Sequence, residues 1–258
     1  MAAMPGLRAH LDALRASLFA GFDAYRERLV IARSDERFSA ALAAAQAIEG
    51  FTTPTELSLL YHLALHARSE GRVVEIGSYL GRSTVVLARA CADAGAPPVV
   101  AVDPHTAALG IEGRPPRDTK GDFLANMEQA GVADHVQLHH ATSVEAATRW
   151  EGEPIRMEFV DGWHSREAVL EDVRSWASWY APGVCVVFDD FMVSDGIRQA
   201  VRELQAEKVL PERGVIVGKM AAFGPPDVLE QVPVPPGGRL LGRLGAERLE
   251  RVVRLAAR

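Results

Sequence analysis

The sequence predicts an α/β protein with a doubly wound, mainly parallel sheet, helices on both faces and additional helices at the N-terminus. Two observations support this prediction. From residue 72 to about residue 224, short β-branched runs alternate with amphipathic helical stretches, and the runs are apolar throughout. Such strands are typical of parallel sheets that helices cover on both faces, and right-handed crossovers are expected to connect them.

Five runs are predicted as the parallel strands, and each ends in a glycine, an acid or a histidine. They read RVVEIG, PVVAVD, HVQLHH, IRMEFVDG and GVCVVFDD. A sixth run, GVIVGKMAAF, predicts a final strand that allows an antiparallel neighbour. Helices are predicted between the strands at 82–94, 120–130, 143–150, 166–180 and 195–207.

The chain divides into three parts. Residues 1–52 are predicted as an N-terminal helical segment and residues 53–224 as the α/β domain. The domain opens with a clearly marked helix, in which Thr53 is the N-cap, Pro54 lies in the first turn and Glu56 has the capping-box position. Residues 225–258 are predicted as a Pro- and Gly-rich linker without regular structure, followed by a basic amphipathic helix. This helix is expected to pack or to form a dimer, in preference to binding a membrane or a partner protein.

Composition argues against several classes of partner. The net charge is −6 and the pI is near 5.8, which disfavours a nucleic acid or an anionic membrane as the main partner. No stretch reaches the roughly 18 apolar residues of a membrane span. The two cysteines, Cys91 and Cys185, lie in apolar contexts and indicate the reducing cytoplasm rather than a disulfide framework.

The turn after the first strand, IGSYLGRST, contains the first candidate site. Gly77 and Gly81 permit a tight turn and a close approach of the backbone to a ligand, just before a helix N-terminus. The spacing is G-x-x-x-G instead of the G-x-G-x-x-G of dinucleotide sites, and Glu75 suits a cationic ligand better than a pyrophosphate. Asp103 ends the next strand, where an acid accepts hydrogen bonds from ribose hydroxyls. The plain alternative is two turn glycines and two surface acids.

Carboxylates also end two later strands. Asp161 follows one strand, with His164 three residues further on, and Asp189 and Asp190 close another. Buried carboxylates need a cation, hydroxyl groups or a metal nearby, and two adjacent acids after an apolar strand are costly without one. The local alternative is that Asp161 caps a turn and the His164 ring lies in solvent.

Together these motifs resemble a known family. The runs VVEIGSYLGRSTVVLA, VDP, FVDGWHSREAVLEDVRSWASWYAPG and FDDF…GIRQAV are similar to class I S-adenosylmethionine-dependent methyltransferases. Within that class they are most similar to the macrocin O-methyltransferase and cephalosporin-hydroxylase-like small-molecule O-methyltransferases. The resemblance covers about residues 50–224. It implies a Rossmann-like sheet of seven strands, S-adenosylmethionine as the cofactor, and a hydroxyl of a natural-product sugar or phenol as the methyl acceptor.

The resemblance also implies roles for individual residues. Glu75, Gly77, Ser78 and Gly81 would border the methionine part of the cofactor, Asp103 would hold the ribose, and Thr142 and Ser143 would lie by the adenine. Asp161, Asp189 and Asp190 would bind a divalent cation, most simply Mg²⁺, that lowers the pKa of the acceptor hydroxyl. His164 would take the proton.

One departure from the family leaves the metal open. The family commonly reads D-G-D-H-x-Y, whereas Trp163 and Arg166 replace the second acid and the aromatic residue. The loss of an acid allows a weaker ion, or a reaction in which His164 is the base and no metal takes part. Trp163 could instead form a wall of the acceptor pocket.

Two other functions compete with methyl transfer. One is a nicotinamide-dependent oxidoreductase, which the glycine spacing disfavours; the other is a cofactor-binding, non-catalytic partner protein. The extra helices at both ends predict a homodimer. The polar insert at 105–122 is either a lid or an ordinary surface loop, and His62 and His66 are expected on a surface face rather than in a zinc site.

Overall fold

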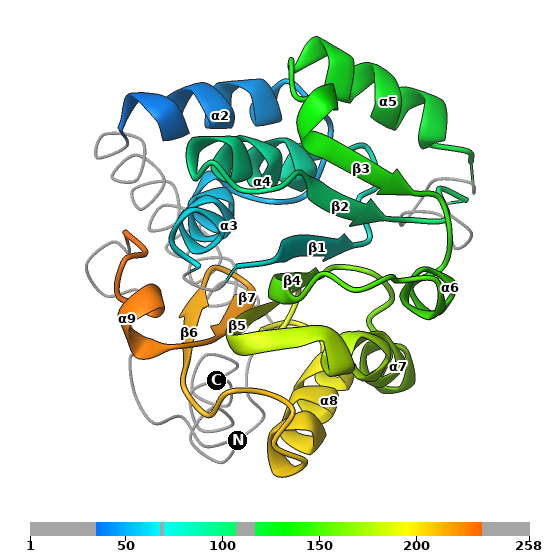
Figure 1. Cartoon of the computed structure of the whole chain (residues 1–258), viewed down its shortest axis with the longest axis vertical. Helices are drawn as coiled ribbons and strands as arrows, with labels where there is room; N and C mark the ends of the chain where they lie inside the picture. The colour runs from blue at the N-terminus through cyan, green and yellow to red at the C-terminus, as the bar shows by residue number, and fades with distance from the viewer. Residues whose placement is uncertain (1–34, 68–69, 107–116, 234–258) are drawn as a thin grey trace, which may run out of the picture.

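The structure, a computed structural model of the whole chain, describes residues 35–67, 70–106 and 117–233. Its centre is a seven-stranded sheet with the order β3-β2-β1-β4-β5-β7-β6 (Figure 1). The strands are β1 (Arg72–Ile76), β2 (Val99–Val102), β3 (Val136–His139), β4 (Ile155–Val160), β5 (Tyr180–Phe188), β6 (Gly214–Val217) and β7 (Met220–Phe223). The predicted doubly wound, mainly parallel sheet is confirmed.

Strand direction changes only at one edge of the sheet. The pairs β1–β2, β2–β3, β1–β4 and β4–β5 are parallel, whereas β7 runs antiparallel to both β5 and β6. The run GVIVGKMAAF is therefore a hairpin, which confirms the antiparallel neighbour that the sequence allowed. Successive strands extend outward from β1 on one side and from β4 on the other, so the order reverses between these two strands.

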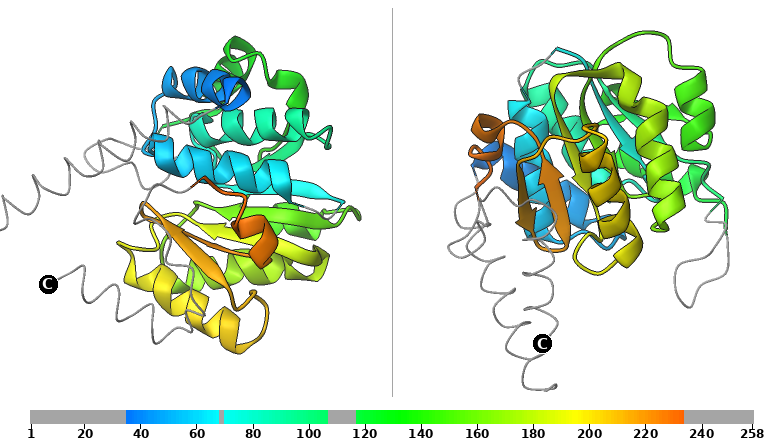
Figure 2. Two further views of the ribbon diagram at one scale, coloured as in Figure 1. Left: turned by 90° about the vertical axis from the view of Figure 1, so that its left-hand side faces the viewer. Right: turned by 90° about the horizontal axis from the view of Figure 1, so that it is seen from below.

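Helices cover both faces of the sheet, as Figures 1 and 2 show from three sides. One face carries α2 (Glu36–Gln46), α3 (Pro54–His66), α4 (Arg82–Asp93) and α5 (Lys120–Gln129). The other face carries α6 (Ser143–Thr148), α7 (Arg166–Trp176) and α8 (Asp195–Ala206). Two short 3₁₀ turns, Ala133–His135 and Ala177–Trp179, precede β3 and β5.

The two-sided burial explains why the strands read as apolar throughout. Neighbouring residues of β1 point to opposite faces: Val73 packs in the cluster that includes α3 and α4, and Val74 packs with Trp176 of α7. Both valines are fully buried. A strand with only one covered face would show alternating polar residues instead.

Several helix boundaries follow from caps that the sequence contains. At the start of α3, the Thr53 amide donates to Glu56 Oε2 at 2.9 Å and the Glu56 amide donates to Thr53 Oγ1 at 3.4 Å, which confirms the predicted capping box. The helix predicted at 166–180 is shorter than expected, because α7 ends at Trp176 and β5 already begins at Tyr180.

The segments at the ends differ from the prediction in one place. Residues 225–233 are not an unstructured linker, because Pro226–Leu229 form the short helix α9, and Val228, Leu229 and Val232 are buried in the cluster that contains α3. These apolar side chains cover one end of the core despite the prolines around them. The first predicted helix and the basic C-terminal helix lie outside the described residues.

His62 and His66 do not form a free surface face. Their rings stack on each other with centroids 6.0 Å apart, and His62 also packs against Phe38 and Tyr61. Burial and the neighbouring His66 lower the pKa of His62 to about 4. The pair is therefore part of the packing between α2 and α3, not a zinc site.

Candidate active site

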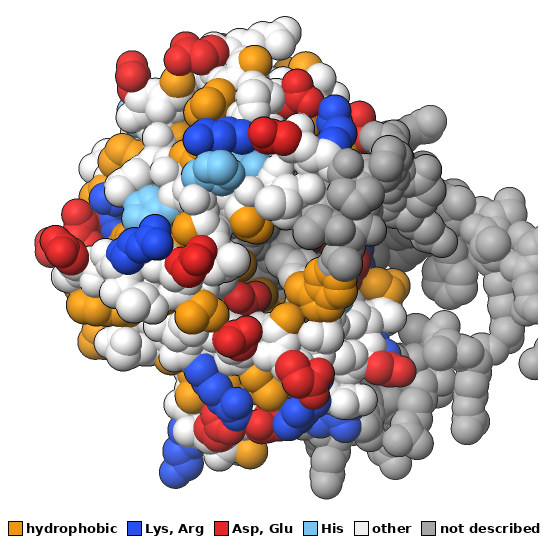
Figure 3. Space-filling model, turned by 90° about the vertical axis from the view of Figure 1, so that its right-hand side faces the viewer, with side chains coloured by type: hydrophobic (Ala, Val, Ile, Leu, Met, Phe, Trp, Pro, Cys, Tyr) orange, Lys and Arg blue, Asp and Glu red, His pale blue; other side chains and the backbone are white. Residues whose placement is uncertain are grey.

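A cavity of about 560 Å³ opens at the carboxyl ends of the parallel strands. Its walls come from the turns after β1, β2, β4 and β5, from the start of α6, from the β6–β7 turn and from residues 49–52 between α2 and α3. Figure 3 shows this side of the molecule as a hollowed surface with acidic side chains in the hollow. Open parallel sheets bind their ligands at this position, where the strand order reverses, and the volume suits a small molecule.

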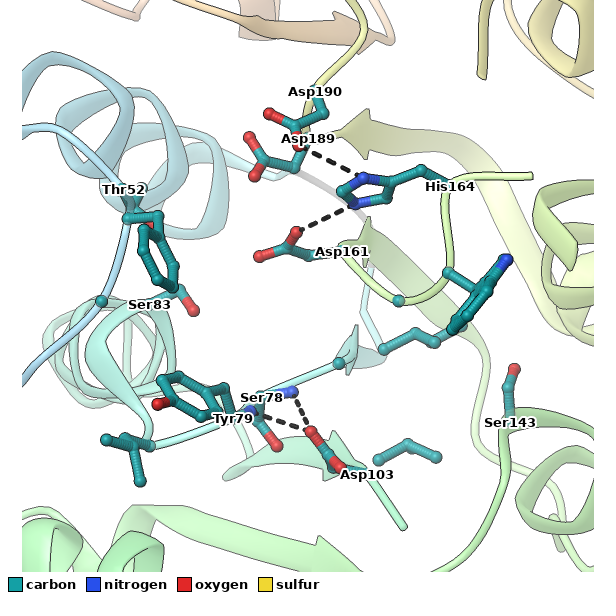
Figure 4. Close-up of a pocket in the computed structure, with 18 of the residues that line it drawn as sticks. Thr52, Ser78, Tyr79, Ser83, Asp103, Ser143, Asp161, His164, Asp189 and Asp190 are labelled. Carbon is teal, nitrogen blue, oxygen red and sulfur yellow. Dashed lines mark hydrogen bonds and ion pairs between the residues drawn. The ribbon is translucent and has the colours of Figure 1, made fainter. Parts of the chain in front are cut away.

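At one end of the cavity, Asp103 organises the turn after β1 (Figure 4). Its Oδ2 accepts hydrogen bonds from the backbone amides of Ser78 and Tyr79, both at 2.8 Å, and its Oδ1 accepts from the His105 amide at 2.6 Å. Three of the carboxylate's roughly four acceptor positions are thus used by the protein itself. Asp103 thus lines the cavity and also holds the turn in place, and its contact with a ribose stays a prediction.

The two glycines of the turn are required by packing within the protein. Gly77 has φ +85°, and a Cβ there would lie 2.2 Å from the carbonyl oxygen of Asp161. Gly81 has φ +93°, and its Cβ would lie 2.3 Å from Cε of Met127 in α5. Gly77 lines the cavity, but Gly81 does not. The glycines thus let the turn approach the end of β4 and α5, and the close approach of Gly77 to a ligand stays a prediction.

Glu75 lies beneath the turn and does not line the cavity. It is fully buried, and its Oε2 accepts a hydrogen bond from the hydroxyl of Thr84 in α4. Burial raises the pKa of Glu75 to about 7, although hydrogen bonds from Ser83 and Thr84 oppose this rise. This position fits a role in supporting the start of α4 rather than the predicted contact with a cofactor.

At the other end of the cavity, Asp161, Asp189, Asp190 and His164 gather from the ends of β4 and β5 (Figure 4). His164 lies between two carboxylates: Nε2 is 3.7 Å from Oδ1 of Asp161, and Nδ1 is 3.2 Å from Oδ2 of Asp190. Burial, and then the charge of Asp189, raise the pKa of Asp161 well above its ordinary value. The four residues predicted at the strand ends are brought together.

Lys219 completes this cluster, and the sequence analysis did not identify it. Its Nζ lies 2.7 Å from Oδ2 of Asp189 and 2.8 Å from Oδ1 of Asp190. The lysine belongs to the β6–β7 turn, which reaches the carboxyl end of β5 because β7 is antiparallel to β5. Lys219 meets Asp189 across 30 positions of the chain, so no local sequence pattern pointed to it.

The three acids do not fit a divalent ion at the predicted place. Carboxylate oxygens are the donors that Mg²⁺ prefers, but Lys219 already binds one oxygen of Asp189 and one of Asp190. Asp189 Oδ1 is buried and has no hydrogen-bond partner. Among the residues that the structure describes, no group of three or more His, Cys, Asp or Glu side chains is arranged to hold a metal ion.

Thr142 and Ser143 line the cavity at the start of α6, and their contact with an adenine stays a prediction. Thr142 is the N-cap of α6, and Ser143 Oγ accepts a hydrogen bond from Trp176 Nε1 at 3.0 Å. Asp172 of α7 lines the same wall, and burial raises its pKa to about 6 although Ser143 hydrogen-bonds to it. Asp172 was missed because an acid within an amphipathic helix carries no local signal.

Two large apolar side chains line the cavity and are exposed. Phe51 is 59 % exposed and Trp163 is 49 % exposed. Trp163 therefore lines the cavity, and its contact with a methyl acceptor stays a prediction. Thr106 and Thr119 also line the cavity, whereas residues 107–116, the centre of the insert proposed as a lid, lie outside the described residues.

Comparison with known proteins connects this cavity to a family. Residues 74–191 match a family model described as a methyltransferase domain, and this stretch includes β1, β4, β5 and the acids at their ends. Over this stretch the chain is therefore similar to methyltransferase domains. Two parts of the cavity lie outside the matched stretch: residues 49–52 and Lys219.

Several solved structures share the fold of this chain. The O-methyltransferase from Bacillus cereus, in complex with SAH, is 18% identical with a TM-score of 0.56, and the match covers 80% of this chain and 97% of that chain. The O-methyltransferase TomG from Streptomyces achromogenes, in complex with SAM, is 20% identical with a TM-score of 0.50. The match covers 74% of this chain and 90% of TomG. Cofactor-bound Rv0187 from MTB is 22% identical with a TM-score of 0.51, and the match covers 74% of this chain and 90% of Rv0187.

Proposed function

We propose that this protein is a class I methyltransferase that transfers the methyl group of S-adenosylmethionine to a hydroxyl of a small molecule. The observation that carries the proposal is the position of His164 at one end of the cavity, with its two ring nitrogens facing Asp161 and Asp190. An imidazole held between carboxylates is a suitable general base. The residues that suit a nucleoside lie at the opposite end of the same cavity.

The described residues fit S-adenosylmethionine. Asp103 and the turn at Gly77 and Ser78 would border its ribose and methionine parts, and Thr142 with Ser143 would lie by the adenine. The cofactor supplies an electrophilic methyl group on a positively charged sulfonium. The end of the cavity near His164 holds three carboxylates and one lysine ammonium, so it is acidic. An acidic cavity favours a cationic ligand.

The chain's own residues would prepare the acceptor. His164 would take the proton of the acceptor hydroxyl as the new oxygen–carbon bond forms and the sulfur–carbon bond breaks. Asp190, 3.2 Å from Nδ1, would orient the imidazole and stabilise it when it carries the proton. The exposed rings of Phe51 and Trp163 would hold an apolar or ring-shaped acceptor in place.

We propose a sugar or phenol of a natural product as the acceptor. TomG, one of the similar structures, is named as involved in tomaymycin synthesis, which supports this class of substrate. The magnesium ion that the resemblance implies has no part in the proposed reaction, because Lys219 holds two of the three acids.

Three expectations from the sequence stay predictions: a homodimer, a cytoplasmic location, and the absence of nucleic-acid or membrane partners. Both cysteines are buried and free, in agreement with the expected reducing compartment. No helix within 35–67, 70–106 or 117–233 has the length and apolar character needed to cross a membrane.

A methyl-transfer assay with labelled S-adenosylmethionine and a panel of phenols and sugars tests the proposal. We expect transfer to at least one hydroxyl, and a rate lower by about 10²–10⁴-fold in His164→Ala. The cofactor affinity of the variant should stay close to that of the wild type, since His164 acts on the acceptor. A variant with full activity would rule out the assigned base, and binding of a nicotinamide cofactor in place of S-adenosylmethionine would favour the oxidoreductase.

A further inference from the structure

The lysine in the acidic cluster is held rigidly by its backbone. The amide of Lys219 donates to Glu56 Oε1 at 2.8 Å, and its carbonyl accepts from the Met192 amide at 3.0 Å. The preceding Gly218 has φ +61°, and a Cβ there would lie 2.3 Å from Glu56 Oε1. The turn therefore needs a glycine at position 218 so that the amide of Lys219 can reach Glu56.

Glu56 links this turn to the start of α3. Its side chain is almost fully buried, and its second oxygen, Oε2, accepts hydrogen bonds from both the amide and the hydroxyl of Thr53 at 2.9 Å. The residue that the sequence identified as part of a capping box thus also fixes the hairpin. Because both oxygens of Glu56 have hydrogen-bond partners, its carboxylate is held in place. The backbone of Lys219, which donates to this carboxylate, is therefore held in place as well.

The ammonium of Lys219 lies where a metal was expected. It bridges Asp189 and Asp190, and its side chain is 23 % exposed. Burial alone would lower the pKa of Lys219, but the charges and hydrogen bonds of the two aspartates outweigh burial and raise it. A divalent ion on the same oxygens would be repelled by this ammonium at short range.

Lys219 also reaches the proposed base through one intermediate residue. Asp190 contacts Lys219 with Oδ1 and His164 with Oδ2. Asp190 also has φ +48°, an uncommon backbone conformation for a residue with a side chain. The orientation of the imidazole therefore depends on a chain of contacts that begins at the β6–β7 turn.

We propose that Lys219 is the resident cation of the acidic cluster, takes the place of a divalent metal ion and positions His164 through Asp190. The absence of a metal requirement follows from the geometry alone, whereas the positioning of His164 rests on the proposed function. Lys219 is thus a positioning residue that lies outside the stretch matched by the family model.

Binding of Mn²⁺ alone, followed by electron paramagnetic resonance on the metal-free full chain, tests the proposal without a methyl acceptor. Lys219→Met removes the charge and keeps the length, and Lys219→Arg keeps the charge as the matched control. We expect no Mn²⁺ binding up to about 1 mM in the wild type and in the arginine variant, and binding at least about tenfold tighter in the methionine variant. Asp189→Asn in the methionine background should remove the gained site.

Thermal unfolding with and without MgCl₂ gives a second readout. At a concentration near 100 times Kd, Mg²⁺ should raise the Tm of Lys219→Met by about 5 °C and leave the wild type unchanged. Micromolar Mn²⁺ binding by the wild type would overturn the proposal, and this result does not require the variant to fold. A titration of the wild type with S-adenosylmethionine, run separately, shows whether the proposed function itself fails.

Discussion

Substitution of Gly77 by alanine tests whether the turn after β1 is shaped by the protein itself. The residue has φ +85°, and an added Cβ would lie 2.2 Å from the backbone oxygen of Asp161. Ordinary contact begins near 3.4 Å, so the turn and the end of β4 would have to separate by about 1.2 Å. The Asp161 amide donates to the Ile76 carbonyl at 2.8 Å, and this bond between the two strands would be strained.

The cost can be worked out from these contacts. An alanine in a left-handed conformation costs about 1–2 kcal/mol, and the smaller entropy of the unfolded variant returns about 0.4–1 kcal/mol. Overlap with a packed backbone adds about 1–3 kcal/mol, and a weakened strand hydrogen bond adds about 1 kcal/mol. We therefore expect Gly77→Ala to lower the free energy of unfolding by about 3–5 kcal/mol.

Gly95→Ala is the matched control. Gly95 also has a positive φ, +63°, but no atom lies within 4 Å of its added Cβ. The free energy of unfolding of the Gly95→Ala variant should fall by only about 1 kcal/mol. The assays are urea unfolding followed by circular dichroism and calorimetric titration with S-adenosylmethionine, whose affinity should drop about tenfold or more in Gly77→Ala alone.

Equal losses of stability in the two variants would refute this reasoning. They would mean that the overlap with Asp161 relaxes at no cost and that only the backbone angle matters. Unchanged cofactor affinity in a folded but destabilised Gly77→Ala would show instead that the turn does not position the ligand.

Two further predictions concern Asp103, a partly exposed carboxylate at the cavity, and Glu158, a fully buried one. Asp103→Asn leaves a single acceptor oxygen for the amides of Ser78, Tyr79 and His105. The free energy of unfolding should therefore fall by about 2 kcal/mol, and the affinity for S-adenosylmethionine should also decrease. Urea unfolding and calorimetry measure these two quantities, and two unchanged values would argue against the assigned contacts. Burial raises the pKa of Glu158 to about 8 from an ordinary 4.5, although a hydrogen bond from the Tyr180 hydroxyl opposes the rise. The folded chain thus keeps a proton that the unfolded chain releases, and stability should fall as pH rises from about 4.5 to 8, by up to about 5 kcal/mol. Glu158→Gln should flatten this fall in thermal scans between pH 5.5 and 8.5, and an unchanged pH dependence would contradict the assignment.

The sheet and the ends of its strands could be predicted because their signals are local. Uninterrupted apolar runs mark strands buried on both faces, and each run ends at an acid or glycine that the chain order places at one edge. Asp161, Asp189 and Asp190 come together for this reason, since parallel neighbours end side by side. The capping box at Thr53 is equally local and was equally visible.

Other parts of the site depend on contacts between distant residues. Lys219 meets Asp189 across 30 positions, and its amide meets Glu56 across 163. Neither contact has a sequence pattern, because a turn lysine and a capping glutamate are both ordinary surface features. The same holds for residues 49–52, which line the cavity only because α2 and α3 pack beside α4.

The roles of Glu75 and Gly81 show a different limit. Their spacing indicates a ligand-binding turn, yet Glu75 lies beneath that turn and Gly81 accommodates Met127. A glycine or an acid near a site can serve to hold the site in place without contacting the ligand. Only the packing in the structure distinguishes these two roles.

The account rests on acidic groups at one rim of the sheet that attract a positively charged cofactor. Isothermal titration of the full chain with S-adenosylmethionine tests this claim most directly. We predict saturable binding of one molecule per chain with a Kd on the order of 1–100 μM. No heat of binding with ligand at about 1 mM would contradict it.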